Sequence, residues 1–572
     1  MTERRWIMRR YDVAAAERLA AALRIEPIIA ALLVLRGVSE PEEAHRALHP
    51  RLDQLHDPQR MLGMDRAVAR LMSAIARGER ILIYGDYDVD GTTGTALLRR
   101  TLQMLGAQTD YYIPHRIKEG YGINREALER AWAEGYRLLL SVDCGIRSHE
   151  PLEWASAQGM DAIVTDHHLP DPERGTPPAI AVLNPNQPGC PYPDKNLAGV
   201  GVAFKLAHAL LRASGRAAEA TVHGFLKLVA IGTVADVAPL IGENRTIVAL
   251  GLRDLPNARN RGLRALMEVT GCGARRNLNA YDIGFLIGPR INAAGRMDAA
   301  RMVVQLLEAE DDAQARELAG KLDEYNRERQ RLQGELFEEA LVEVAETLDG
   351  SHVVVVAREG WHRGVIGLVA SKLVERTGRP AVVISLEGDN GHGSARSIEE
   401  YHLLDGLSSC AELFEDFGGH KYAAGLRIKR ERIEELRQRL NEHAAGVLRP
   451  EDLTPALRID MELPPHALTL DLAREIEKLE PFGTGWRRPI FLTRRLEVDG
   501  GPRVLKERHL KFCVRGADNT RYDSIWWRAL ESGRRTPRAG EIIELVYSVE
   551  LDRWRRKEGL VLVVEDCRVM SD

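Results

Sequence analysis

The sequence predicts an α/β protein with two α/β lobes joined by a long helix and followed by a small β-barrel. From about residue 61, short runs rich in Val, Ile and Leu alternate with amphipathic helical patterns, which is typical of a parallel sheet covered on both faces. No proline occurs between Pro289 and Pro380, where the chain reads as a long charged helix. After Pro450, several short strand-like runs are separated by turns, which favours a barrel.

The elements follow in order along the chain. Helical patterns precede the apolar runs "RILIYGD", "YRLLLSVDCG" and "MDAIVTDHH" in the first lobe. A second strand–helix–strand pattern starts at "HVVVVA" and returns at "PAVVIS". We therefore expect five parts: a helical segment at 1–60, the first lobe at 61–299, a connecting helix at 300–349, the second lobe at 350–448 and the barrel at 449–572.

The bulk composition is that of an ordinary globular protein. Of the 572 residues, 44% are hydrophobic and 28% are charged, which is enough apolar material for several cores. The six cysteines form no CxxC pair, which argues against a zinc ribbon or a disulfide framework. The apolar run "IIAALLVL" is too short to span a bilayer, and the N-terminus has charges where a signal peptide has an apolar region. These features predict a cytoplasmic protein without membrane association.

The charge is unevenly distributed. The net charge is -5, which does not indicate a nucleic-acid-binding protein, yet residues 487–538 contain 14 Lys/Arg against 6 Asp/Glu. Such a basic region on a mildly acidic protein is compatible with phosphate binding there and a carboxylate cluster elsewhere. The alternative is a solvated, arginine-rich surface.

The stretch "GDYDVDG" begins like a calcium-binding loop. Asp86, Asp88 and Asp90 stand on alternate positions and Gly91 follows, but the glutamate expected at loop position 12 is replaced by Leu97. An apolar strand, and not a helix, precedes the loop. Three neighbouring carboxylates repel one another unless a cation is present. The stretch therefore predicts a divalent metal site of another kind, the alternative being a polar Asp/Gly turn.

Metal-type ligands recur at the ends of three other candidate strands. Asp143 stands in "SVDCG", Asp166, His167 and His168 in "TDHH", and Asp236 in "GTVADVAPL". Ligands collect at the carboxyl ends of parallel strands, so we expect these side chains to converge. Carboxylates with imidazole suit Mn²⁺, Mg²⁺ or Zn²⁺, and the predominance of oxygen ligands favours Mn²⁺ or Mg²⁺. A site this acidic is expected to hold two ions, as in phosphoryl transfer.

In this order, "DYDVDG", "SVDCG", "TDHH" and "GTVADV" resemble the four motifs of the DHH phosphoesterase superfamily. "GSARS" and "FGGHKYAAG" are similar to the DHH-associated domain. "RIKEGYG", "GPRINAAGRM", "GWHRGVIGLVASKL" and "LEPFGTG" narrow the resemblance to the single-strand-specific exonucleases of that superfamily. The resemblance implies a two-lobed DHH phosphoesterase, with a catalytic domain at 61–299, a DHH-associated domain at 350–448 and a C-terminal OB-fold.

The resemblance also implies roles for individual residues. It makes Asp143 the bridge between two metals and places His168 against the scissile phosphate. It implies that Asp86 and Asp166 orient the ligand residues. Asp86 is nevertheless included in the set of metal-binding residues given next, and Asp166 in the set of catalytic residues. The metal set is Asp86, Asp88, Asp90, Asp143, His167 and Asp236, and the catalytic set is Asp143, Asp166 and His168. The set for the 5′-phosphate and the DNA is Arg290, Asn292, Arg296, Ser394, Arg396, Gly419 and His420. For each arginine the alternative is a surface ion pair.

The activity implied is 5′-to-3′ exonucleolytic hydrolysis of single-stranded DNA to 5′-mononucleotides, in DNA repair and recombination. The expected cofactors are two Mn²⁺ or Mg²⁺ ions, and the expected partners of a monomeric protein are single-stranded-DNA-binding protein and a helicase. Trp526 and Trp527 are candidates for base stacking, but neighbours on a strand face opposite ways, so one of them is expected in the barrel core. Trp486, Arg487 and Ala395 depart from the family pattern, which affects the expected strand path and not the reaction.

Three other functions fit the sequence less well. A DHH enzyme for oligoribonucleotides or cyclic dinucleotides needs no long binding path, so the C-terminal barrel argues against it. A non-catalytic replication scaffold on this fold has lost metal ligands, whereas they are intact here. A dinucleotide-binding Rossmann protein has a G-x-G-x-x-G after its first strand, and this sequence does not.

Overall fold

The computed structural model describes residues 4–116, 118–517, 519–553 and 558–570. The chain divides into two compact units. The larger unit comprises Leu55–Ala238 and Gly242–Leu453, and the smaller comprises Met1–Gln54, Pro239–Ile241 and Thr454–Asp572. Among the helices of the described residues, none combines the length and the apolar character needed to cross a membrane.

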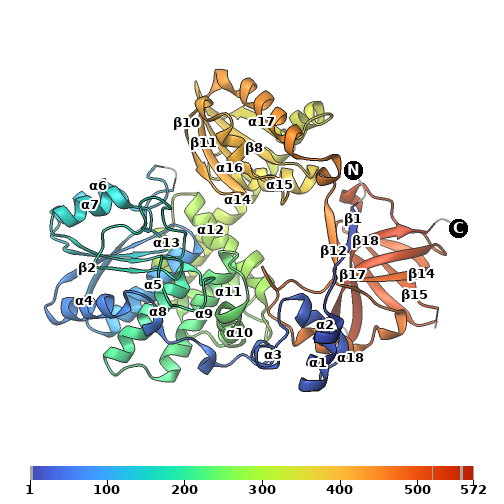
Figure 1. Ribbon diagram of the computed structural model, residues 1–572, viewed down its shortest axis with the longest axis horizontal. Helices are drawn as coiled ribbons and strands as arrows, with labels where there is room; N and C mark the ends of the chain where they lie inside the picture. Colours follow the sequence, from blue (N-terminus) through green and yellow to red (C-terminus); the bar gives the residue numbers. More distant parts are fainter. Residues whose placement is uncertain (1–3, 117, 518, 554–557, 571–572) are drawn as a thin grey trace. The chain divides into compact units, whose positions relative to one another are not determined.

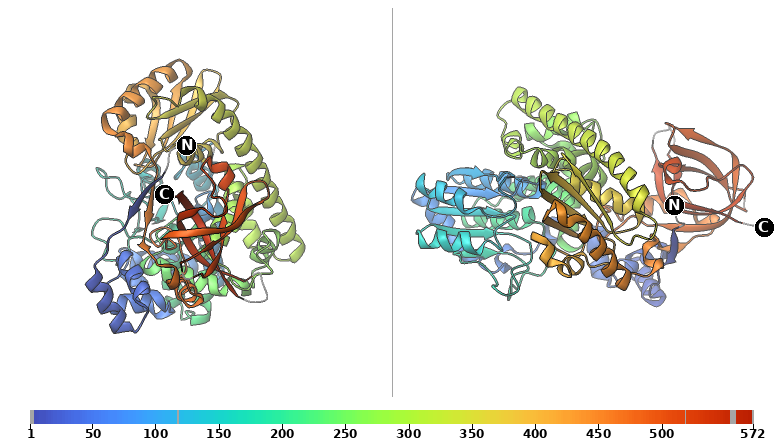
Figure 2. Two further views of the ribbon diagram at one scale, coloured as in Figure 1. Left: turned by 90° about the vertical axis from the view of Figure 1, so that its right-hand side faces the viewer. Right: turned by 90° about the horizontal axis from the view of Figure 1, so that it is seen from above.

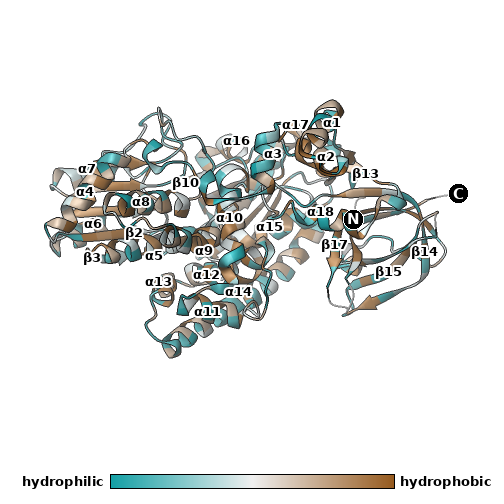
Figure 3. Ribbon diagram, turned by 90° about the horizontal axis from the view of Figure 1, so that it is seen from below, coloured by the Kyte–Doolittle hydropathy of each residue, from teal (hydrophilic) through white to brown (hydrophobic). Residues whose placement is uncertain are grey.

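The first lobe of the larger unit is built on a five-stranded parallel sheet (Figure 1). The strands lie in the order β3-β2-β4-β5-β6, and their residues are mostly hydrophobic (Figure 3). One face packs against α6 and α7 through a core that includes Leu139, Leu128 and Leu152, and α4, α5 and α8 cover the other. The bounds are β2 Arg80–Gly85, β3 Gln108–Tyr112, β4 Leu138–Val142, β5 Asp161–Thr165, β6 Ala181–Leu183, α4 Met64–Ala76, α5 Val89–Met104, α6 Arg125–Ala133, α7 His149–Ala157 and α8 Gly199–Ala213. The predicted parallel sheet with both faces covered is confirmed.

A helical region follows the sheet and leads into the second lobe. A π-helical turn, η4, runs directly into α12, and the connecting helix α14 extends over 36 residues (Figure 2). The predicted single helix from about residue 300 is two helices, because Asp311 caps a new one by accepting the amides of Ala313 and Gln314. The bounds are α9 Glu219–Ala235, α10 Gly242–Asp254, α11 Arg261–Val269, η4 Asp282–Ile287, α12 Gly288–Arg296, α13 Arg301–Leu307 and α14 Asp312–Thr347.

The second lobe is a mixed sheet in the order β10-β11-β9-β8-β7. Only β7 and β8 pair in parallel, and the other neighbours are antiparallel. The bounds are β7 Val354–Glu359, α15 Ile366–Thr377, β8 Ala381–Glu387, β9 Asn390–Arg396, α16 Leu403–Ser408, β10 Phe414–Gly419, β11 Ala423–Lys429 and α17 Ile433–Val447.

The smaller unit contains the predicted barrel. Its sheet has the order β13-β14-β15-β16-β18-β17, and additional pairing of β14 with β17 closes it. The N-terminal segment was expected to be helical, but it contains a strand, β1, before its helices. This strand pairs in parallel with β12, which lies about 450 residues later in the sequence. The bounds are β1 Arg5–Met8, α1 Val13–Leu23, α2 Pro27–Leu35, α3 Pro41–Leu48, β12 Ala456–Ile459, β13 Met461–Glu462, α18 Leu470–Glu477, β14 Phe491–Leu505, β15 His509–Arg515, β16 Arg521–Trp526, β17 Ile542–Asp552 and β18 Gly559–Val569.

Candidate active site

The three aspartates of "GDYDVDG" lie where β2 ends and α5 begins. Asp88 caps α5, and its Oδ1 accepts the amide of Gly91 at 3.0 Å. Gly91 has to be glycine, because a Cβ there would lie 2.6 Å from the Asp86 carbonyl oxygen. Asp90 is buried in the first turn of α5, where its carboxylate accepts two amides from the start of α8, at 2.6 and 2.8 Å. The turn therefore fixes three carboxylates at the carboxyl edge of the sheet.

Asp143 follows β4 in a left-handed backbone conformation, with φ of 62°. This conformation is uncommon for a residue other than glycine and is often found at functional sites. The amide of Asp143 donates to Thr165 O at 2.9 Å. A Cβ at Gly199 would lie 2.5 Å from Asp143 Oδ1, so the start of α8 packs directly on this carboxylate.

Asp166 orients the histidine pair that follows it. Its buried carboxylate accepts the amides of Ile146 and His167, at 2.9 and 2.7 Å. Its Oδ1 also lies 2.8 Å from His168 Nδ1. Burial acts to raise the pKa of Asp166, but the hydrogen bond and charge of His168, the charge of His167 and the amide of Ile146 together outweigh burial, so the pKa is lowered. Burial alone would lower the pKa of His168, and the same hydrogen bond raises it. Asp166 is thus a support for His168, as the resemblance implies.

Seven side chains form three potential metal-binding groups. Within each group the ligand atoms lie within 4.8 Å of one another. His167 Nε2 is 3.3 Å from Asp143 Oδ1 and 3.8 Å from Asp236 Oδ2. Asp143 and His167 each belong to two groups, so both connect neighbouring sites. The groups are Asp86, Asp88 and Asp143; Asp90, His167 and Asp236; and Asp143, His167 and His168.

The chemistry of this cluster fits divalent cations. Asp86 Oδ1, Asp143 Oδ1 and His167 Nε2 are buried polar atoms without a hydrogen-bond partner, which is costly unless a ligand satisfies them. Burial, and then the neighbouring carboxylate of Asp88, raises the pKa of Asp90 to about 7. Burial, followed by Asp90, raises the pKa of Asp236 to about 9. Burial lowers the pKa of His167 to about 4, which keeps its imidazole in the neutral form that binds metals.

Three residues that hold the histidine pair were given no role in the sequence analysis. Tyr121 Oη lies 3.0 Å from His168 Nδ1 and donates to Asp143 O at 3.2 Å. Asn184 Nδ2 donates to His168 O at 2.8 Å, and Asn186 Nδ2 donates to His167 O at 2.7 Å. Tyr121 belongs to the motif "RIKEGYG", so that motif was the available signal.

A second cluster contains Arg296, Ser394 and Arg396 near the start of α15. Because the sequence predicts that these residues bind the terminal phosphate, we call this cluster the phosphate pocket. Arg296 Nη1, from α12, donates to Gly364 O at 3.0 Å, and Arg396 Nη1 donates to Ser394 Oγ at 3.2 Å and to Ala395 O at 2.7 Å. A Cβ at Gly367 would lie 2.9 Å from Ser394 Oγ and 3.1 Å from Arg396 Nη2. These side chains from both lobes therefore meet at one helix N-terminus.

This pocket has the electrostatics of an anion site. Burial, followed by the charge of Arg116, lowers the pKa of Arg296 to about 9. Burial and Arg116 also lower the pKa of Arg396. Among the described residues, the amides of Ile366 and Gly367 at the start of α15 have no hydrogen-bond partner. Crowded guanidinium groups beside free amides at a helix N-terminus favour a bound phosphate. Arg116 and the start of α15 were not singled out from the sequence.

The other residues expected to bind DNA have varied surroundings. Arg290 Nε donates to Asp323 Oδ1 at 3.0 Å, and this bond connects α12 to α14. Arg290 Nη1 also donates to Leu286 O at 2.8 Å. Asn292 is half-buried on α12. Gly419 has φ of +154°, and a Cβ there would lie 2.3 Å from Ala423 O. Burial, and then the charges of Arg147 and His168, lowers the pKa of His420.

The tryptophans of the smaller unit alternate as expected. Trp526 is 3% exposed and lies in the core, whereas Trp527 is 54% exposed and packs edge-on against His509, with ring centroids 4.8 Å apart. Trp486 is 1% exposed and donates to Leu479 O at 2.8 Å. The departure from the family pattern at Trp486 is therefore structural.

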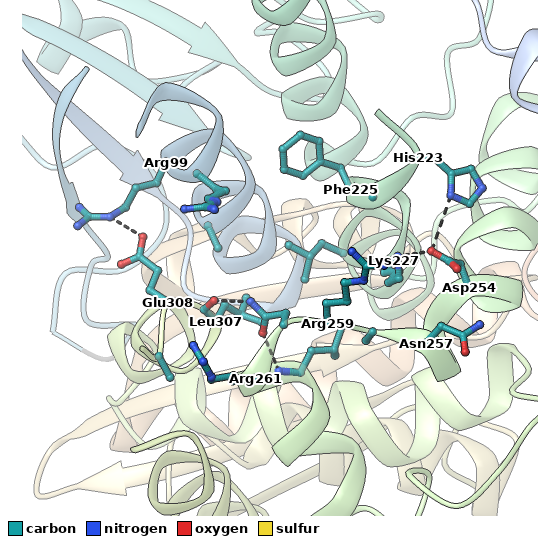
Figure 4. A pocket seen from close by; sticks show the side chains of 18 of the residues that line it. Arg99, His223, Phe225, Lys227, Asp254, Asn257, Arg259, Arg261, Leu307 and Glu308 are labelled. Carbon is teal, nitrogen blue, oxygen red and sulfur yellow. Dashed lines mark hydrogen bonds and ion pairs between the residues drawn. The ribbon is translucent and has the colours of Figure 1, made fainter. Parts of the chain in front are cut away.

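A cavity of about 1230 Å³ lies elsewhere in the first lobe (Figure 4). Its walls come from the ends of α5 and α9 that are farthest from the metal ligands, and from the region before α11. Most of its charges are already compensated: Arg99 pairs with Glu308 at 2.5 Å, and Lys227 pairs with Asp254. None of the predicted site residues lines this cavity, so it is not the catalytic centre.

The fold and the site together define a two-lobed phosphoesterase of the DHH class. The family model described as the DHH family, N-terminal domain, matches residues 80–233, and the DHHA1 domain matches residues 350–446. The RecJ OB domain matches residues 459–566.

Individual relatives narrow the class. The single-stranded-DNA-specific exonuclease RecJ of Bacillus subtilis is 39% identical over 99% of this chain and 71% of its own length, and that of Escherichia coli is 34% identical over 98% of each. The structure of Thermus thermophilus RecJ in complex with Mn²⁺ superposes with a TM-score of 0.85, at 31% identity, over 100% of this chain and 81% of that one. The Mg²⁺ complex gives 0.78, at 30% identity, over 99% and 79%. The chain belongs to the RecJ family of single-stranded-DNA-specific exonucleases.

Proposed function

We propose that this protein is a Mn²⁺- or Mg²⁺-dependent exonuclease that degrades single-stranded DNA from its 5′ end and releases 5′-mononucleotides. One observation carries the proposal. The metal-ligand cluster and the phosphate pocket belong to the same compact unit, and α12 contacts both. A Cβ at Gly288 would lie 3.3 Å from Ala235 Cβ, next to Asp236, whereas Arg296 at the other end reaches Gly364.

Different residues of the chain bind the metals and contact the substrate phosphate. Asp88, Asp90, Asp143, His167 and Asp236 would hold the metals, with Asp86 completing the group around Asp143. The bound ions supply Lewis-acid stabilisation of the phosphodiester oxygens and lower the pKa of water. His168 is held by Asp166 and Tyr121 and would face the substrate phosphate, and the hydrogen bond to Asp166 raises the pKa of His168 against the effect of burial. No protein nucleophile is needed.

The phosphate pocket sets the direction of degradation. Arg296, Ser394 and Arg396 bind the terminal 5′-phosphate, and this anchoring presents the next phosphodiester to the metal centre. Cleavage there leaves a 5′-mononucleotide and a new 5′-phosphate, which can re-enter the pocket.

End-labelled strands test the proposal. We expect 5′-labelled single-stranded DNA with Mn²⁺ to release labelled mononucleotide at once, whereas the 3′-labelled strand shortens gradually. Duplex DNA, RNA and a cyclic dinucleotide serve as comparison substrates. Release of mononucleotide first from the 3′ end would contradict the direction, and preferred hydrolysis of the cyclic dinucleotide would contradict the substrate.

A further inference from the structure

An exposed pair of stacked aromatic rings lies on the π-helical turn η4. Tyr281 and Phe285 are 60% and 64% exposed, their ring centroids are 4.5 Å apart, and their planes differ by only 20°. Large aromatic side chains normally bury most of their apolar surface in the core of a protein. A stacked pair that faces solvent therefore indicates a contact surface. π-Helical turns are rare and occur frequently at functional sites.

The turn that presents these rings is held firmly. Asp282 is buried, accepts the amide of Asn279 at 2.9 Å and pairs with Arg275. Arg290 donates from α12 to Leu286 O at 2.8 Å. Because the backbone is fixed on both sides, the two exposed rings are presented in a defined position.

The same turn is continuous with the catalytic machinery. On its inner side, Gly284 and Gly288 pack against Val234 and Ala235, which directly precede the metal-ligand candidate Asp236. Beyond the turn, α12 continues to Arg296 in the phosphate pocket. Arg296 follows Phe285 by eleven positions, which is about 16 Å along a helix. The rings therefore lie well beyond the position of the terminal phosphate.

We propose that Tyr281 and Phe285 form a stacking platform for bases of the single strand downstream of the nucleotide being removed. This inference rests on the proposed exonuclease function and adds a binding site to it. Nucleobases are the fitting occupant, because the surface joins a phosphate-binding helix and every base offers a π-face. Stacking of this kind is independent of sequence, as degradation of any strand requires.

Substrate length separates this role from a structural one. Because the platform lies beyond the first nucleotide, the double variant Tyr281→Ala/Phe285→Ala should lower kcat/KM about 10-fold or more on a strand of about 16 nucleotides, and leave a dinucleotide unaffected. Phe285→Trp and Tyr281→Phe should retain activity on the long strand, whereas Phe285→Leu, which is apolar without a π-face, should not. Val342→Ala, at an exposed apolar position on α14, is the matched control.

Binding is measured on the same variants in an Asp143→Ala background, with a 2-aminopurine strand whose fluorescence reports stacking. The unmodified platform should quench downstream positions, and the alanine variants should not. Equal losses on the dinucleotide and the long strand, full activity of Phe285→Leu, or unchanged quenching would overturn the proposal. Failure of the exonuclease function is distinct, since the unmodified chain would then release no mononucleotide at any length.

Discussion

Arg396 offers a direct test of 5′-end recognition. Its guanidinium is buried at the start of α15 and is held by Ser394 Oγ and Ala395 O, so it is positioned before substrate arrives. Arg396→Ala removes this donor and should impair the use of 5′-phosphorylated strands. Strands that end in a 5′-hydroxyl never form the contact, so their hydrolysis should change little.

The size of the effect follows from the kind of contact that is lost. A hydrogen bond to a charged group contributes about 1.5–3 kcal/mol. The ratio of kcat/KM for phosphorylated over hydroxyl ends should therefore fall about 10- to 150-fold. Arg396→Lys, which keeps the charge and loses the planar fork, should lie in between.

The assay mixes the two strands, each with its own fluorescent label, and follows both in one reaction. Arg358→Ala, which removes an exposed guanidinium paired with Glu339 at 2.9 Å in the same lobe, is the control and should leave the ratio unchanged. An equal loss on both strands would show a general role in strand binding or folding. A ratio near one for the unmodified protein would refute the pocket itself.

Four further predictions concern the metal centre and its supports. Asp143→Asn should weaken Mn²⁺ binding by at least about 100-fold in a titration, since two ligand groups share this carboxylate; unchanged affinity would contradict the assignment. The pKa values of Asp90 and Asp236 are raised to about 7 and about 9, so the metal-free protein should lose stability as pH rises from about 4 to about 9. Mn²⁺ should therefore raise Tm more at pH 8.5 than at pH 6, and an equal rise at both would contradict this linkage. Tyr121→Phe should slow turnover about 5-fold through a lost hydrogen bond of about 1 kcal/mol, with Tm nearly constant; an unchanged rate would remove Tyr121 from the site. Gly199→Ala should abolish activity by pressing on Asp143, whereas Gly334→Ala, in open space within α14, should stabilise the protein by about 1 kcal/mol in urea unfolding; an active Gly199→Ala variant would contradict the packing.

The fold could be predicted because its cues are local. Apolar runs followed by charged turns marked the strands of the parallel sheet, and strand alternation correctly expected one of Trp526 and Trp527 in the core. The strand at Arg5–Met8 was missed, because its partner lies about 450 residues away and the short run has no alternation of its own. The break before α14 was likewise unmarked by proline or glycine and depends on Asp311 as a cap.

Convergence of residues in the site was harder to predict than their identity. The ligands that follow β2, β4 and β5 have to meet at one edge of a parallel sheet, so their convergence followed from topology. Asp236 was expected at a further strand end, but it follows α9, because the apolar segment before it is helical. Tyr121 sits in an irregular loop, and only the folded chain brings it to His168. The start of α15 lies within the quoted motif "GWHRGVIGLVASKL", but it carries no charged residue, so the motif did not indicate that its free amides lie beside Arg396.

The position of α12 has a consequence for how this protein can change. At one end a Cβ on Gly295 would lie 2.5 Å from Tyr87 O, between Asp86 and Asp88, and at the other Gly288 packs beside Asp236. The helix that carries Arg296 is therefore wedged between both halves of the acidic cluster. A change of product length would require Arg296, the proposed end-binding residue, to move relative to the proposed metal ligands. Because α12 contacts both sites, a substitution that shifts this helix should also disturb the metal ligands. We therefore expect single substitutions in α12 to abolish activity more readily than they change the length of the product.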